Sequence, residues 1–70
     1  MNDIKIAKRI KEIMMEEKLN QVQLAEKIGV TQVAVSNWIN GRKEPSINSL
    51  WLLADYFGVS VDYLIGRKDI

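Results

Sequence analysis

The sequence predicts an all-α fold, a compact bundle of five helices, on three grounds. Apolar residues recur every three or four positions along most of the chain, which is the spacing of one helix face. All four glycines directly follow such a segment, where a helix commonly ends on a residue with positive φ. The single proline, Pro45, directly precedes another segment, and no stretch alternates apolar and polar residues as a strand would. These independent signals agree on the same helix boundaries.

The first predicted helix presents an apolar stripe made of Ile6, Ile10, Ile13 and Met14. Asn2 or Asp3 is expected to cap its start through a side-chain oxygen. The stripe is best explained as a cover for the helices that follow, because two short helices cannot bury their own apolar faces. A membrane-surface role would need lysines along the whole polar face, and the glutamates from Glu12 onward argue against it.

Two short helices are predicted between Asn20 and Gly41, with a sharp turn at Gly29 between them. Asn20 can cap the first helix, and Gln23 three residues later can complete a capping box. Thr31 can cap the second helix in the same way. The sequence therefore marks both starts and both ends of this helix pair.

The inner and outer faces of this pair differ in chemistry. Ala25 is a small residue at the position where two helices joined by so short a turn should cross most closely. No charged residue occurs from 31 to 41, although a merely solvated face would more often carry lysine and glutamate. The inner face is predicted to contain Leu24, Ala25, Ile28, Val35, Trp38 and Ile39, and the outer face of the second helix Gln32, Val33, Ser36, Asn37 and Asn40.

Two further helices complete the predicted bundle. Ser46, after the loop 42–45, is expected to cap the fourth helix, which Gly58 ends. Ser60 is expected to cap a short fifth helix, which Gly66 ends. One face of the fourth helix is predicted to be buried: Ile47, Leu50, Leu53, Ala54 and Phe57.

Composition excludes several classes of function. Seventy residues suit one domain, 1–70, which at this size buries only about 60% of the surface of its unfolded chain. The chain contains neither cysteine nor histidine, so we predict no disulfide, metal site, cofactor or catalytic residue. No apolar run reaches the roughly 18 residues of a membrane span, and the first residues lack a signal-peptide core. We therefore expect a cytoplasmic location.

The segment LAEKIGVTQVAVSNWINGRKEPS closely resembles the helix-turn-helix of phage-repressor, Cro and Xre-type DNA-binding proteins. The resemblance extends from about Ile6 to Ile65. It implies a repressor-like transcriptional regulator that inserts the helix 31–40 into the major groove of a pseudo-palindromic operator, as a homodimer. It assigns base reading to Gln32, Val33, Asn37 and Ser36, and contacts with backbone phosphates to Asn20, Gln21, Thr31, Asn40, Arg42 and Lys43.

The side chains assigned to base reading suggest a preference for A·T pairs. Gln32 and Asn37 carry amides that can pair with adenine N6 and N7, and Val33 can pack on a thymine methyl group. This helix contains no arginine for guanine. We expect A·T pairs to carry more of the information in each half-site than G·C pairs.

The chain departs from the family pattern at two positions. Members of the family commonly carry an arginine where this chain has Met14 and a glutamate where it has Ile39, and the two form an ion pair. Replacing both partners of a buried pair with apolar residues is often neutral or stabilising, whereas losing one leaves a costly unpaired charge. We therefore predict that Met14 contacts Ile39, against the alternative that the two positions changed independently.

Apolar residues outside the predicted core leave two interpretations open. Leu52 is predicted to point away from the buried face of the fourth helix, with Trp51 and Tyr56 at its margins. These residues could form a dimer contact together with Tyr63 or Ile65, or they could be isolated exposed residues, which are common.

A second class of function is a protein-binding module of the antitoxin or anti-repressor kind. Such a module would use Val33, Trp51 and Leu52 as an apolar surface. Four neutral amides favour DNA instead, because amides suit base and phosphate edges and are poor centres for a hydrophobic protein interface. They are Gln21, Gln32, Asn37 and Asn40.

Overall fold

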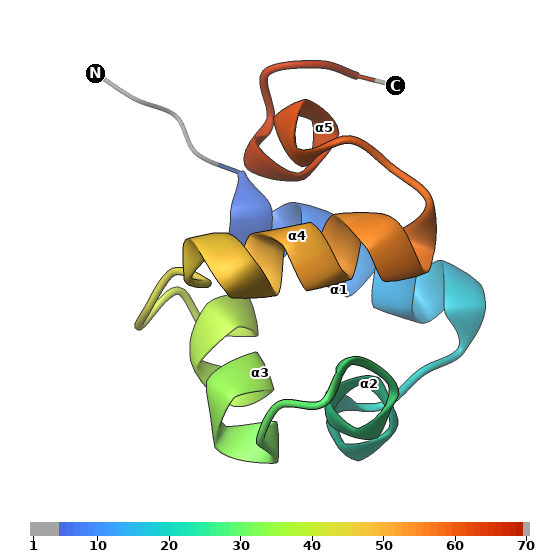
Figure 1. Cartoon of the computed structure of the whole chain (residues 1–70), viewed down its shortest axis with the longest axis vertical. Coiled ribbons are helices and arrows are strands. Elements are labelled where there is room, and N and C mark those ends of the chain that lie inside the picture. Colours follow the sequence, from blue (N-terminus) through green and yellow to red (C-terminus); the bar gives the residue numbers. More distant parts are fainter. Residues whose placement is uncertain (1–4, 70) are drawn as a thin grey trace.

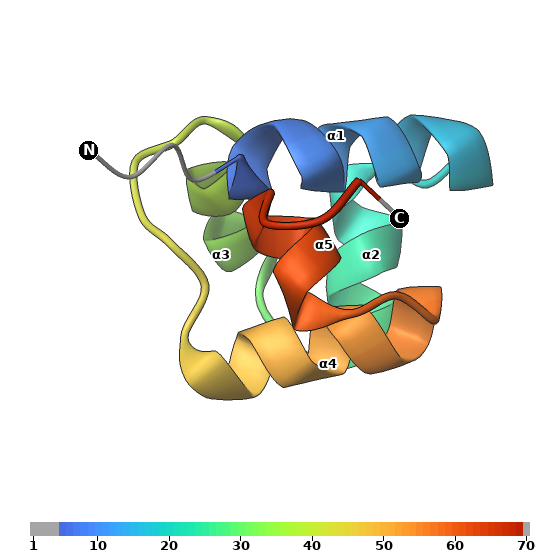
Figure 2. The same cartoon turned by 90° about the horizontal axis from the view of Figure 1, so that it is seen from above.

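The computed structural model describes residues 5–69 and confirms the all-α class, with five helices in that range. Figure 2 shows α1 and α4 on opposite sides of the molecule with the other three helices between them. In the view of Figure 1, α4 lies in front of α1, with α5 above them and α2 and α3 below. None of these helices combines the length and the apolar character that crossing a bilayer requires. The helices are α1 (Ile6–Glu17), α2 (Gln21–Ile28), α3 (Gln32–Ile39), α4 (Ile47–Phe57) and α5 (Val61–Ile65).

The predicted side-chain caps of the last four helices are confirmed. Asn20 Oδ1 accepts a hydrogen bond from the Gln23 backbone N–H at 2.8 Å, and Gln23 Oε1 accepts one from the Asn20 N–H at 2.9 Å. This reciprocal pair is the capping box expected at the start of α2. Thr31, Ser46 and Ser60 each accept a backbone N–H three residues ahead in the same manner. These bonds satisfy N–H groups that the helices themselves leave unpaired.

The two ends of α1 show features that the sequence does not predict. The predicted caps Asn2 and Asp3 lie outside the described residues, and Lys5 occupies the N-cap position without a side-chain cap bond. Its backbone N–H instead donates to the carbonyl of Ile65, which ties the start of α1 to the end of α5. The helix ends at Lys18 with φ of 56°, a left-handed conformation in a residue that is not glycine.

The turn between α2 and α3 depends on the backbone of Gly29. Its φ is 76°, in the left-handed region that side chains bearing a Cβ disfavour. A Cβ built at this position would meet no atom within 4 Å. Glycine is therefore required here by the conformation of the turn rather than by lack of space.

The core is formed by all five helices. Each helix contributes one completely buried aliphatic side chain, and the predicted inner residues of α2 and α3 pack around them. Burial confirms the predicted stripe of α1 and all of the inner face of the helix pair except Ile39, which is half-buried against the core. The five completely buried residues are Ile10, Leu24, Val35, Leu53 and Leu64.

The predicted inner face of α4 is wrong at its first residue. Ile47 is 87% exposed, and the buried position of the first turns belongs to Ser49. Burying this serine is tolerable because its backbone N–H donates to Ser46 Oγ, and Ser46 Oγ donates to its hydroxyl oxygen, both at 3.1 Å. The helix is thus rotated so that Ser49 and Leu53, one turn apart, face the core.

The prediction for Leu52 is also wrong, because this side chain is half-buried and packs against the core. Trp51 and Tyr56 remain 61% and 41% exposed.

Met14 is buried and Ile39 packs against the same cluster, so their direct contact stays a prediction. A separation of more than about 4.5 Å between the two side chains would contradict it.

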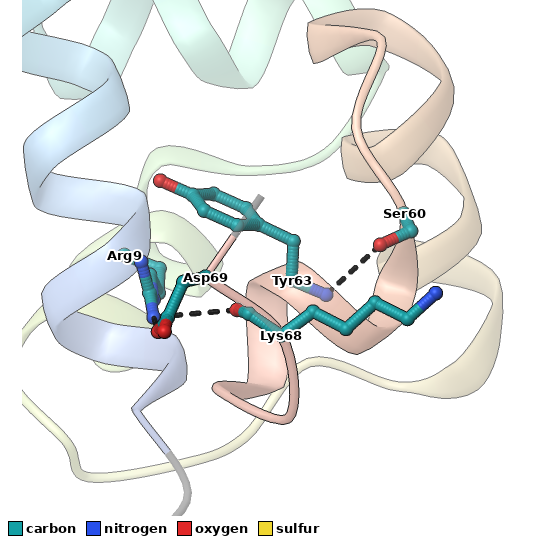
Figure 3. Close-up of polar contacts among 5 residues, drawn as sticks. All are labelled: Arg9, Ser60, Tyr63, Lys68 and Asp69. Atoms are coloured by element: carbon teal, nitrogen blue, oxygen red, sulfur yellow. Dashed lines mark hydrogen bonds and ion pairs between the residues drawn. The ribbon is translucent and has the colours of Figure 1, made fainter.

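Arg9 attaches the end of the chain to α1 (Figure 3). Its guanidinium lies 4.4 Å from the ring centroid of Tyr63, and its Nη2 donates to the carbonyl of Lys68 at 3.4 Å and to Asp69 at 3.5 Å. Tyr63 is the main cause that raises the pKa of Arg9, with the charges of Asp69 and Glu12 adding to it against the effect of burial. Arg9 is therefore a fixed cation that joins α1 to α5.

Replacing Ala25 with leucine tests the close approach of α2 to its neighbours. Ala25 is 4% exposed, so the added methyl groups have to displace packed atoms. We expect Ala25→Leu to lower the free energy of unfolding by about 1 to 3 kcal/mol in a denaturant titration. Glu26→Leu is the matched control, because Glu26 is exposed and its replacement should change stability by less than about 0.5 kcal/mol. Equal effects of the two substitutions would contradict this account of Ala25.

Candidate nucleic-acid interface

The outer face of α3 gathers the four side chains that the resemblance assigns to base reading. Val35 and Trp38 are buried beneath the helix, so the opposite side faces outward. Val33 is 70% exposed and Gln32 is exposed, while Ser36 and Asn37 are half-buried. These four residues and Arg42 together line one shallow hollow of about 310 Å³.

The loop after α3 folds back over the end of that helix. Gly41 has a φ of 71°, and the backbone N–H groups of Arg42 and Lys43 both donate to the carbonyl of Asn37, at 2.9 and 3.3 Å. These two hydrogen bonds to one carbonyl explain how Arg42 reaches the hollow on α3. Both basic side chains are exposed. The sequence indicates a basic loop, but not that Arg42 lies beside the outer face of α3.

Asn40 is linked directly to Ser36. Its Nδ2 donates to Ser36 Oγ at 3.2 Å, four residues earlier in the chain. The bond fixes the Asn40 amide at the end of α3, and the Ser36 hydroxyl proton remains free to donate elsewhere. A residue predicted to contact phosphate and a residue predicted to contact bases thus hold one another in place. Sequence reasoning missed this pair, although the four-residue spacing of two polar side chains is a signal for it.

The start of α2 provides a second group of donors. Asn20 Oδ1 is occupied by the capping bond, which leaves the Nδ2 group of this side chain as its donor to an external partner. Gln21 follows at the first helical position and is half-buried. The first turn contains no acidic residue, so the positive end of the helix dipole is not neutralised there. Such a helix start suits an anionic group.

Thr31 occupies a comparable place at the start of α3. Its Oγ1 accepts the Ala34 N–H at 3.1 Å, and its hydroxyl proton is still free to donate. The predicted phosphate-contacting residues therefore lie at the two helix starts, at the end of α3 and in the loop that follows it. Within residues 5–69, no group of three or more acidic, cysteine or histidine side chains could hold a metal ion.

Relatives of the chain include transcription factors. The uncharacterized HTH-type transcriptional regulator YobD of Bacillus subtilis is 36% identical over 61 residues, which cover 87% of this chain and 54% of that protein. The immunity repressor protein of Bacillus phage phi105 is 34% identical over 65 residues, which cover 93% of this chain and 45% of that protein. The chain thus spans about half the length of these relatives.

A solved structure shares the fold. The P22 c2 repressor, crystallised in complex with a synthetic operator, aligns with a TM-score of 0.83 at 30% identity, over 90% of this chain and 96% of that chain. A family model described as helix-turn-helix matches residues 10–64, which include α2, α3, α4 and most of α1. The chain therefore belongs to the helix-turn-helix family of the Cro/C1 type.

Proposed function

We propose that this chain binds specific sequences of double-stranded DNA and regulates transcription as a repressor, with α3 in the major groove. The observation that carries the proposal is the single hollow on the outer face of α3, which brings together Gln32, Val33, Ser36, Asn37 and Arg42. Amide, hydroxyl and apolar groups on one exposed helix face match the donors, acceptors and methyl groups that base edges present there. The related P22 c2 repressor was crystallised in complex with a synthetic operator, which supports binding of this chain to double-stranded DNA.

The backbone of the DNA would be held at both ends of the hollow. Asn20, Gln21 and Thr31 lie at the two helix starts, where N–H groups and the helix dipole favour a phosphate. Asn40 and Lys43 lie at the other end, where Asn40 is fixed by its bond to Ser36. Neutral donors set the position of α3, and the charged side chains supply the salt dependence of binding. None of these contacts requires a metal or a cofactor.

We propose that two copies of the chain bind DNA as a dimer, because a single recognition helix reads only a few base pairs. A two-fold dimer would place two α3 helices about 34 Å apart, on successive turns of the major groove of a pseudo-palindromic operator. Trp51 and Tyr56 on α4 offer exposed apolar surface for such a contact, close to the half-buried Leu52 in sequence. For a protein that acts on DNA in this way, we also propose a cytoplasmic location.

The protein-binding alternative has less support. It requires Val33, Trp51 and Leu52 to serve one apolar surface, yet Leu52 packs against the core and Val33 lies among amide side chains. Hydrophobic hot spots are usually central apolar or aromatic clusters, which the hollow on α3 does not provide.

Gln32→Ala tests the assignment of base reading. A selection from random DNA duplexes should return a two-fold symmetric motif for the natural chain, with A·T pairs dominant. We expect the variant to lose its preference at one position in each half-site, a discrimination of about 1 to 3 kcal/mol. Asn48→Ala is the matched control, since it removes an exposed amide from α4. A motif that is unchanged by Gln32→Ala would show that this assignment is wrong. An invariant guanine contacted by α3 would instead contradict the expected preference for A·T pairs.

Lys43→Ala tests the contact with phosphate. Loss of one phosphate contact should weaken binding to all sequences alike and should reduce the slope of log affinity against log salt by about 0.9. Fluorescence anisotropy at several salt concentrations measures both quantities. Lys27→Ala, which removes an exposed lysine of α2, should leave the slope unchanged. A change confined to one DNA sequence would instead assign Lys43 to base reading.

A further inference from the structure

A groove lies between α1 and the end of α3, and apart from Asn40 its residues have no role in the function proposed above. It encloses about 500 Å³, and its walls include Lys8, Lys11 and Met15 from α1, facing Ile39 and Asn40 at the end of α3. The two helices pack against one another, so the groove is a fixed feature of the fold. Asn40, which is one of the residues proposed to contact backbone phosphates, lies at one edge of this groove.

Two lysines in this groove are free to bind an external anion. Lys8 and Lys11 are three residues apart, so they lie on the same side of α1, and both are exposed. Within the described range 5–69, the one ion pair joins Arg9 to Asp69, and it involves neither lysine. Arg9 lies against the ring of Tyr63 on α5 (Figure 3) and does not line the groove. Of the three basic residues of α1, Arg9 thus serves the fold, whereas Lys8 and Lys11 face solvent.

The position of these lysines suggests what they bind. The chain carries no charge from 31 to 41, so α3 itself cannot supply the Coulomb attraction that dominates binding to DNA. Glu12 is the single acidic residue on the groove, against two ammonium groups, so the local balance is positive. Flexible lysine stems carry point charges that suit phosphates whose exact positions vary.

We propose that Lys8 and Lys11 bind backbone phosphates of the DNA strand that passes the C-terminal end of α3. This assignment rests on the proposed function and extends the backbone contacts from Asn40 onto α1. It makes α1 a part of the binding surface as well as a cover for the core. The groove would thereby add two counterion-releasing contacts for each chain.

The test compares two double variants of equal charge on a single random-sequence duplex. Lys8→Gln with Lys11→Gln removes both groove lysines, and Lys27→Gln with Lys68→Gln removes two exposed lysines from α2 and from the segment after α5. Anisotropy titrations across salt concentrations give the slope of log affinity against log salt. We expect the groove variant to lower this slope by about 1.8 per chain and the control variant to leave it near the natural value. Lys8→Arg with Lys11→Arg should retain the natural slope.

The outcomes separate the two proposals. A slope reduced by the groove variant and kept by the arginine variant supports the assignment. Equal slopes for the groove variant and the control overturn it while leaving the proposed function intact. Failure of the natural chain to bind any duplex at low salt overturns both. Thermal unfolding of each variant verifies folding, and the exposed positions of all four lysines predict unchanged midpoints.

Discussion

Five completely buried aliphatic side chains, one from each helix, determine how the binding face is presented. Because a helix turns once in 3.6 residues, burying Val35 with Trp38 against this core directs Val33 and Asn37 to the opposite side. α3 packs on α1 and α2, whose completely buried residues Ile10 and Leu24 fix the surface on which it rests. The exposed side chains of this outward face, Gln32 and Val33, are thus not needed for packing of the core and are available for recognition. Mutations that loosen the core would therefore disturb the binding face without touching it.

The parts of the fold that depend on local chemistry could be predicted from the sequence. A cap depends only on residues within one helical turn of it, such as Asn20 and the Gln23 N–H at the start of α2, or Gly29 at its end. The structure confirms both of these predicted ends. The parts that depend on distant neighbours could not. Ile47 and Ser49 point to nearly opposite sides of α4. Which of the two faces inward depends on the rotation of this helix against the core and on the hydroxyl of Ser46. The end of α1 at Lys18 had no glycine to mark it.

The same distinction applies to the candidate site and to its charges. Outward residues of α3 follow from helical spacing, but the placement of Arg42 beside them depends on the bonds from its loop to Asn37. A net charge of +1 gives little overall attraction to DNA, so the position of each cation matters more than their number. Arg9 serves the fold, whereas Arg42 lies on the proposed binding face. The sequence alone does not show which of these two arginines stabilises the fold and which lies on the binding face.

The central claim is that the outer face of α3 meets DNA, and amide chemical-shift mapping of the labelled chain tests it most directly. Titration with a short duplex at low salt reports on each backbone N–H and does not require the operator sequence. The account predicts that the shifts concentrate in α3, in the first turn of α2 and in the loop 41–43, and the further proposal adds α1 around Lys8 and Lys11. Shifts confined to α4 and α5, or no shifts at all, would contradict it.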